Sequence, residues 1–150
     1  MHAERDASLD AVVCRDVVWT LPDPARAYAE WFRVLKPGGT LVVFDGDYLY
    51  KEPEGLLYRL WYALSWTLIL LTEWRVRRRT SKDQPALGEL PFVQVLRPEA
   101  DETALRQAGF TIREIRRNFI PGYKWSLNYL KYGCQTGVRF MIIAKKELSA

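Results

Sequence analysis

Two groups of residues that could do chemistry lie at the ends of two short apolar segments, and each group contains a carboxylate. At the end of residues 9–15 and just beyond it are Cys14, Arg15, Asp16 and Trp19, and at the end of residues 39–45 and just beyond it are Asp45, Gly46, Asp47 and Tyr48. In open parallel α/β sheets, ligands bind in the crevice beyond the carboxyl ends of the strands, where a carboxylate can orient a molecule or accept its proton. An equally weighted interpretation is that Asp16 and Asp45 cap loops and that Trp19 covers the edge of the core.

The segments before these groups have the pattern of a β-α-β unit. Residues 9–15 and 39–45 are too short for typical helices and contain many β-branched residues, as buried parallel strands do. Between them, Asp23 is a suitable N-cap and Pro24 suits the first helical position. Apolar residues then recur at helical spacing until Lys36-Pro37-Gly38-Gly39, which we expect to end the helix. Two parallel strands need such a crossover.

Residues 54–74 form a long apolar segment with three tryptophans, and an arginine-rich stretch follows it. This composition suits a helical lid over a substrate pocket, a helix on a membrane surface or, less well, a membrane span. A helix that simply packs on the sheet fits as well as the lid. We therefore expect a helix here and leave its role open.

The remaining segments predict a mixed sheet with an antiparallel edge. Acidic residues begin a short helix over residues 98–108, and Gly109 ends it. Residues 110–119 and 137–144 have strand patterns and can pair antiparallel at one edge of the parallel sheet. The loop 75–94 and the aromatic, turn-rich segment 120–133 connect these elements. The chain is thus expected to be a single α/β domain over residues 1–150, with residues 54–97 as an insertion.

Charge is distributed unevenly along the chain, whose formal net charge is +4. Residues 1–54 hold six Lys/Arg and ten Asp/Glu, a net charge of −4, so residues 55–150 carry +8. Nucleic acid, an anionic membrane or an acidic substrate could use such basic clusters. Because no DNA- or RNA-binding motif surrounds them, we expect solvated surface and no nucleic-acid partner. The clusters are Arg75, Arg77, Arg78, Arg79 and Lys82, and Arg113, Arg116 and Arg117.

Metal and disulfide chemistry receive no support from the sequence. Cys14 and Cys134 lack CxxC spacing, and the single histidine is His2, so we expect no metal site. The polar first residues do not resemble a secretory signal, and the expected location is cytoplasmic.

At this level of detail the chain resembles a known family. The stretches 9–15, 19–24 and 31–45, with the turn Arg-Val-Leu-Lys-Pro-Gly-Gly, look like the C-terminal half of class I S-adenosylmethionine-dependent methyltransferases of the small-molecule branch called type 11. The helix ending Ala-Gly-Phe and the final strand ending Ala-Lys-Lys fit as well. The resemblance implies a partial Rossmann-like sheet with a helical insertion, S-adenosylmethionine as cofactor, and methyl transfer to a small, apolar or aromatic molecule.

The resemblance also suggests roles for particular residues. It implies Asp16 and Asp45 as the catalytic base or orienting group. The residues it implies for the cofactor are Ala3, Glu4, Cys14, Arg15 and Asp16. The substrate would meet Trp19, Asp45 and Tyr48, and Trp61 and Tyr62 would line an apolar pocket.

One part of the family pattern does not occur in this sequence. The family binds its cofactor with a Gly-rich turn after its first strand, and no GxGxG is present. A glycine turn lets backbone amides approach the ligand, so its loss should weaken cofactor binding severely. We therefore expect a truncated enzyme whose independent activity is doubtful. Strand 9–15 would be an exposed edge open to self- or hetero-association. Alternatives are a non-catalytic, methyltransferase-like partner subunit and a membrane-surface protein that makes peripheral contact through residues 56–79.

Overall fold

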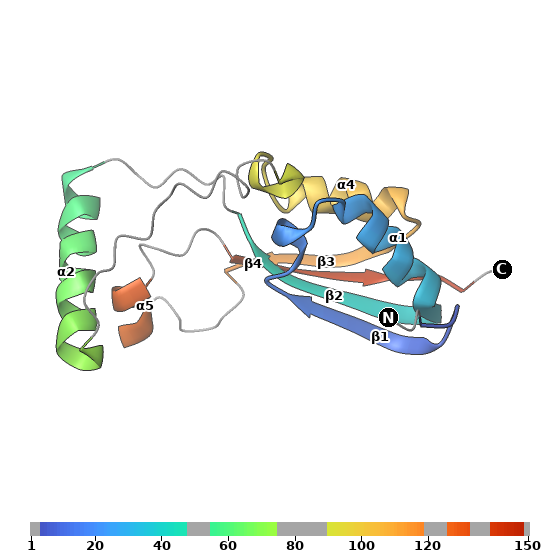
Figure 1. Cartoon of the computed structure of the whole chain (residues 1–150), viewed down its shortest axis with the longest axis horizontal. Helices are drawn as coiled ribbons and strands as arrows, with labels where there is room; N and C mark the ends of the chain where they lie inside the picture. Colours follow the sequence, from blue (N-terminus) through green and yellow to red (C-terminus); the bar gives the residue numbers. More distant parts are fainter. Residues whose placement is uncertain (1–3, 48–54, 75–89, 119–125, 133–138, 149–150) are drawn as a thin grey trace.

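A four-stranded mixed sheet forms the centre of the molecule. The computed structural model describes residues 4–47, 55–74, 90–118, 126–132 and 139–148. The strands β1 (Leu9–Arg15), β2 (Leu35–Gly46), β3 (Thr111–Arg117) and β4 (Arg139–Lys145) lie in the order β1-β2-β4-β3 (Figure 1). β1 and β2 are parallel, whereas β4 is antiparallel to both β2 and β3. The predicted α/β class with an antiparallel C-terminal edge is confirmed.

Helix α1 (Pro24–Val34) connects the parallel strands and begins as predicted. The Asp23 carboxylate accepts a hydrogen bond from the Arg26 backbone N–H at 2.9 Å, and Pro24 occupies the first turn. The helix ends at Val34, just before the predicted stop, but the predicted start of the second strand was wrong, because β2 begins at Leu35 rather than at Gly39. Lys36 precedes a proline, which disfavours helical backbone there. Residues 36–39 therefore form an irregular start to β2, and Leu9 pairs with Leu35 but Ala11 with Thr40.

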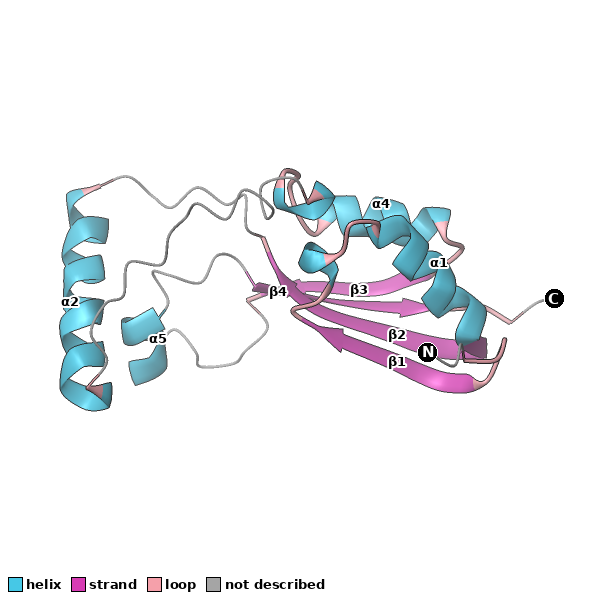
Figure 2. Ribbon diagram, in the orientation of Figure 1, coloured by secondary structure: helices cyan, strands magenta, loops and turns pink. Residues whose placement is uncertain are grey.

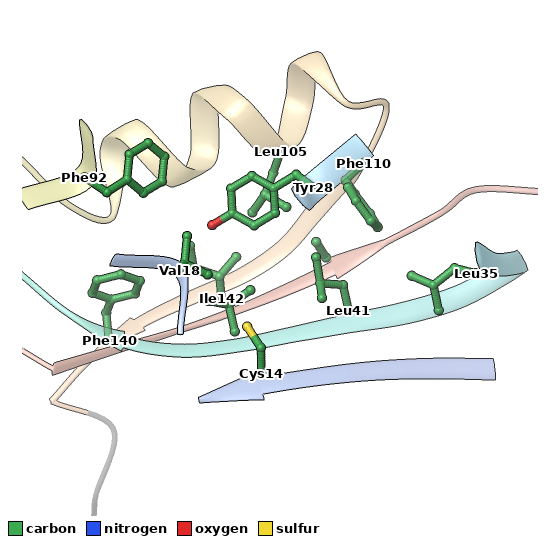
Figure 3. Close-up of a cluster of buried hydrophobic side chains, with 12 residues drawn as sticks. Cys14, Val18, Tyr28, Leu35, Leu41, Phe92, Leu105, Phe110, Phe140 and Ile142 are labelled. Carbon is green, nitrogen blue, oxygen red and sulfur yellow. The ribbon is translucent and has the colours of Figure 1, made fainter. Parts of the chain in front are cut away.

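Helices α1 and α4 (Glu99–Gln107) cover the same face of the sheet (Figure 2). The hydrophobic core lies between these helices and the strands, where side chains from both layers meet (Figure 3). Fully buried members include Tyr28 of α1, Leu105 of α4, and Leu41, Phe140 and Ile142 of the sheet. The helix predicted over residues 98–108 is confirmed as α4.

The predicted helix in residues 54–74 is present as α2 (Leu56–Glu73), and it packs on a short helix that was not predicted, α5 (Leu127–Tyr132). Figure 1 shows this pair apart from the sheet, on the side where β1 and β2 end. α2 therefore does not lie against a face of the sheet as α1 and α4 do. In the part of the chain that the structure describes, no helix is long and apolar enough to cross a membrane.

Two short 3-10 helices lie near the ends of the parallel strands. They are η1 (Val18–Thr20), which follows β1, and η2 (Pro91–Val93), which precedes α4 and contacts η1. η2 falls in a region that was expected to be a loop. Residues 75–89 of that predicted loop, and residues 119–125 and 133–138, lie outside the described residues.

Strand β1 is an edge of the sheet, as expected. Its side chains are mostly accessible, and Val13 is 65% exposed. The backbone polar groups on its outer side have no neighbouring strand in the described structure.

Candidate functional site

Asp16 lies directly beyond the carboxyl end of β1. Its backbone has a positive φ of 53°, and its N–H donates to the Phe44 carbonyl of β2 at 2.9 Å. Arg139, the first residue of β4, donates to both carboxylate oxygens of Asp16, and Arg15 Nε is 3.6 Å from one of them. The side chain of Asp16 is 34% exposed. Asp16 is therefore a partly accessible carboxylate that contacts two arginines.

Asp45, at the end of β2, is instead buried. Its Oδ1 accepts a hydrogen bond from the Gly46 N–H at 2.8 Å, and its Oδ2 accepts one from the Trp19 N–H at 3.3 Å. The guanidinium of Arg97 lies 3.0 Å from the same Oδ2. Asp45 thereby ties the strand to η1 and to the segment before α4.

Arg97 is the centre of this buried cluster. Its Nε and Nη2 donate to the two carboxylate oxygens of Asp101 at 2.7 and 2.6 Å, and its guanidinium lies over the rings of Phe92 and Phe140. Burial lowers the pKa of Arg97, but Asp101 and Asp45 outweigh burial and keep this pKa above its ordinary value. The arginine remains a cation, as two buried carboxylates require.

The pKa values of two side chains, Tyr28 and Asp45, are shifted within this cluster. The Tyr28 hydroxyl donates to Asp101 Oδ1 at 2.6 Å, and burial together with that carboxylate raises the pKa of Tyr28. Burial also raises the pKa of Asp45, although Arg97 opposes this shift. The carboxylate of Asp45 is thus enclosed by donors within the core, where it connects the end of β2 to the start of α4 through Arg97.

Cys14 points into the core rather than toward the strand ends (Figure 3). Burial, assisted by the nearby charges of Asp45 and Asp101, raises the pKa of this thiol to about 12. Cys14 therefore behaves as a small apolar side chain of the core. Its assignment to the cofactor stays a prediction, and this packing does not support it.

The structure brings only some of the predicted site residues together. Arg15, Asp16, Trp19 and Asp45 lie at the carboxyl edge of the parallel strands. Glu4 lies at the other end of β1, where its carbonyl accepts a hydrogen bond from Arg33 at 2.8 Å. A seven-residue strand separates Glu4 from Asp16 by roughly 20 Å. Ala3 and Tyr48 lie outside the described residues.

Trp61 and Tyr62 belong to α2 and contribute to its own packing. Trp61 Nε1 donates to the Leu130 carbonyl of α5 at 3.1 Å, and its ring lies 5.1 Å from that of Tyr129. The Tyr62 ring is stacked on Tyr58 at 6.2 Å. Because α2 lies apart from β1 and β2 (Figure 1), the structure does not join these aromatic residues to Asp16 and Trp19.

Sequence reasoning missed Arg97 and did not pair Asp101 or Tyr28 with it. The four-residue spacing of Arg97 and Asp101 around a helix start was the available signal for an ion pair. No pattern in the sequence indicated that this pair would meet Asp45, which is far away along the chain. Among the described residues, no group of three or more His, Cys, Asp or Glu side chains is arranged to hold a metal ion.

The second basic cluster of the sequence is exposed but paired. Arg113 contacts Glu147, Arg116 contacts Glu114, and Arg117 contacts Glu99. Each guanidinium therefore has a carboxylate beside it, which supports the expected solvated surface. The cluster at residues 75–82 lies outside the described residues.

Comparison with known proteins points to one family. Residues 2–43, which contain β1, α1 and most of β2, match a sequence model of the methyltransferase domain. Over 70 residues the chain is 36% identical to the thiol S-methyltransferase TMT1B of Rattus norvegicus. Over these residues the chain is similar to methyltransferase domains, which confirms the resemblance to class I S-adenosylmethionine-dependent methyltransferases seen in the sequence. That the chain matches only the C-terminal half of that family stays a prediction.

Several solved structures share the fold of this chain. An S-adenosylmethionine-dependent methyltransferase of Methanosarcina mazei matches with a TM-score of 0.55 and 23% identity, over 99% of this chain and 64% of that chain. A Thermotoga maritima protein, described as a possible histamine N-methyltransferase, matches with a TM-score of 0.52 and 19% identity, over 96% of this chain and 59% of that chain. The cyclase SpnF matches with a TM-score of 0.55 and 18% identity, over 99% of this chain and 53% of that chain. Such identities show the fold alone.

The chain spans only part of the length of these proteins. Its match to the rat enzyme covers 47% of this chain and 25% of that protein, and it spans between half and two thirds of the three solved structures named above.

The predicted cofactor contacts at the strand ends differ in their environments. Arginines contact both carboxylates, and the Cys14 thiol faces the core. Arg15 is exposed at this edge and Asp16 is partly exposed.

Proposed function

We propose that this chain supplies part of an S-adenosylmethionine-dependent methyltransferase that acts on a small, apolar or aromatic molecule. The supporting observation is that the segment matched by the methyltransferase domain is the β1-α1-β2 unit, whose carboxyl edge carries Asp16 and Trp19. We further propose that this chain binds the cofactor weakly by itself, because it contains no glycine turn.

The two candidate carboxylates differ in what they can do. Asp16 is partly exposed and borders the strand end, so it can orient an acceptor or receive its proton. Asp45 is enclosed by Arg97 and two backbone amides, and its contribution to the proposed activity is to hold the η1 segment in place. The name of the rat relative supports including thiols beside aromatic acceptors among the molecules to be tested.

Calorimetric titration with S-adenosylmethionine tests the proposal. The chain alone should give no measurable heat of specific binding. A chimera that adds before residue 1 a strand-GxGxG-helix segment of the kind that the family resemblance implies should bind the cofactor and methylate a thiol or aromatic acceptor. The same chimera with its three glycines changed to alanine is the control. Tight binding by the chain alone would contradict the proposed incomplete site.

A second candidate function is that of a non-catalytic methyltransferase-like subunit. It is favoured by the arginine contacts that occupy both oxygens of Asp16. In that case the chimera would bind cofactor without transferring methyl groups, and Asp16→Asn would change nothing. If the chain is catalytic, Asp16→Asn in the chimera should lower kcat by about 100-fold while leaving cofactor affinity unchanged.

A further inference from the structure

Helix α2 has two apolar faces, and α5 covers one of them. On the covered face, the Trp61 indole donates to the Leu130 carbonyl, and Glu73 accepts hydrogen bonds from Lys131 at 3.1 Å and Tyr132 at 2.6 Å. Ser65 and Ile69 of the same face are buried. These contacts fix the rotation of α2 about its axis, and they turn the opposite face outward.

The outward face of α2 is also apolar. Its large side chains are all exposed, and they are Leu56, Leu57, Leu60, Leu64, Leu70, Leu71 and Trp74 at the C-cap. With 3.6 residues per turn, these positions span about 140° of the helix circumference. Leu57 is 83% exposed and Trp74 is 88% exposed. Arg59 is the one exposed charged residue on α2.

Exposure of so large an apolar face to water is unfavourable in free energy. Surface helices of soluble proteins carry charged residues opposite their buried stripe, and a contiguous exposed apolar patch marks a site of association. The patch is wider than the narrow seam of a coiled coil, and Arg59 is the one exposed charged residue that flanks it, too few to set the register of a helix pair. Its shape suits a deformable apolar medium better than a second helix.

Charge favours an anionic lipid surface over a second copy of the chain. The sequence continues after α2 with Arg75, Arg77, Arg78, Arg79 and Lys82, and residues 55–150 carry a net charge of +8. Such cations attract anionic headgroups, whereas two copies of the chain would bring like charges together. Tryptophan is preferred at the boundary between acyl chains and headgroups, and in the sequence Trp74 follows the leucines and directly precedes the cations.

We propose that the exposed face of α2 inserts into the interface of an anionic membrane, while α5 covers its other face. The leucines enter the acyl boundary, Trp74 lies at headgroup level, and the helix remains parallel to the membrane plane. This inference does not depend on cofactor binding, because α2 lies apart from the strand ends.

Flotation with lipid vesicles tests the inference. The wild-type chain should float with vesicles of phosphatidylcholine and phosphatidylglycerol at low salt, and binding should weaken as salt rises. The triple variant Leu57→Gln/Leu64→Gln/Leu71→Gln should partition about 100-fold more weakly, since it removes three apolar side chains from the interface. Leu148→Gln, which changes an exposed leucine outside α2, is the matched control and should bind like wild type.

Two further readouts keep the test decisive. Tryptophan emission should shift to the blue on vesicle addition, and Trp74→Phe should reduce that shift while binding is largely retained. Circular dichroism establishes that the triple variant is folded. The inference is overturned if the wild type does not float at low salt, or if the triple variant floats equally well. It is also overturned if light scattering shows a lipid-free dimer that the triple substitution dissociates.

Discussion

At the scale of single residues, Arg97 has the most demanding environment in the described structure. It is fully buried between the carboxylates of Asp45 and Asp101, and two aromatic rings lie against its guanidinium. The cation offsets the cost of burying two negative charges, and the carboxylates in turn satisfy its donors. Such a cluster contributes specificity of packing more than net stability, but it does not tolerate the loss of one partner.

Replacement of Arg97 by methionine should therefore be strongly destabilising. Arg97→Met leaves Asp45 and Asp101 buried without a cation, and we expect a loss of about 3–5 kcal/mol in the free energy of unfolding. Urea denaturation followed by circular dichroism measures it. The control is Arg106→Met, which removes an exposed ion pair with Glu102 and should cost less than about 1 kcal/mol. Equal effects of the two substitutions would show that the buried cluster is not coupled as described.

Cys14 should be unreactive in the folded protein. Its raised pKa of about 12 means that the thiolate is scarce at every pH below that value. In a Cys134→Ser background, which leaves one thiol, alkylation by iodoacetamide should be slow throughout about pH 7 to 9, and its rate should still be rising at pH 9 instead of levelling off near the ordinary thiol pKa of about 8.5. Addition of urea should restore the rate of an ordinary cysteine. Fast alkylation without denaturant would place Cys14 at the surface.

At the scale of elements, helix caps and turns set where each segment ends. Gly109 follows α4 with a φ of +100°, and a Cβ at this position would lie 3.0 Å from the ring of Phe32 in α1. Phe32 itself packs edge-on against Phe110 at 5.1 Å. The glycine thus serves both the left-handed exit from the helix and the close approach of α1 to β3.

Gly109→Ala should lower stability through both effects. We expect a loss of roughly 2 kcal/mol, because alanine is disfavoured in left-handed backbone and its methyl group contacts the aromatic ring. Thermal unfolding checks this expectation. Gly55→Ala is the matched control, since its backbone is extended and an added Cβ meets no atom within 4 Å. A neutral Gly109→Ala would mean that α1 and β3 can separate at little cost.

At the scale of the whole molecule, β1 is the feature that most needs a partner. It is an edge strand, and long uncovered edges promote pairing with another chain. Solved structures of the same fold extend beyond the part that this chain matches, which covers 53–64% of three of them. An association at this edge, with a second copy or with another chain, remains our proposal for how the molecule satisfies its open backbone groups.

A lysine on the edge strand should suppress that association. Val13 is 65% exposed, so Val13→Lys should leave the fold intact while it adds a charge that must be desolvated when another strand pairs with β1. Size-exclusion chromatography with light scattering should show a larger share of monomer than for wild type. Val95→Lys places the same charge on an exposed valine outside the sheet and should leave association unchanged. A wild-type chain that is already a stable monomer of 17.5 kDa would contradict this expectation.

Much of the sheet could be predicted because local signals and its tertiary environment agree. The bounds of β1, the N-cap at Asp23 and the end of α4 at Gly109 follow from apolar patterning, a capping carboxylate and a glycine, all of which act within a few residues. The Arg-Val-Leu-Lys-Pro-Gly-Gly stretch was sufficient to indicate the family, although not the residue at which α1 gives way to β2.

Contacts between residues far apart in the sequence decided which groups are buried and which faces are exposed. Nothing local to Arg97 indicates that it lies beside Asp45, since that contact requires β2 and the start of α4 to be packed in three dimensions. The same holds for α2: composition shows that it is apolar on all sides, but only its packing on α5 reveals which side is left for a partner. The sequence by itself determined most of the elements and the resemblance to the family, because these depend on neighbouring residues. The tertiary structure alone decided which carboxylate is enclosed and which is accessible, because burial is a property of the assembled molecule.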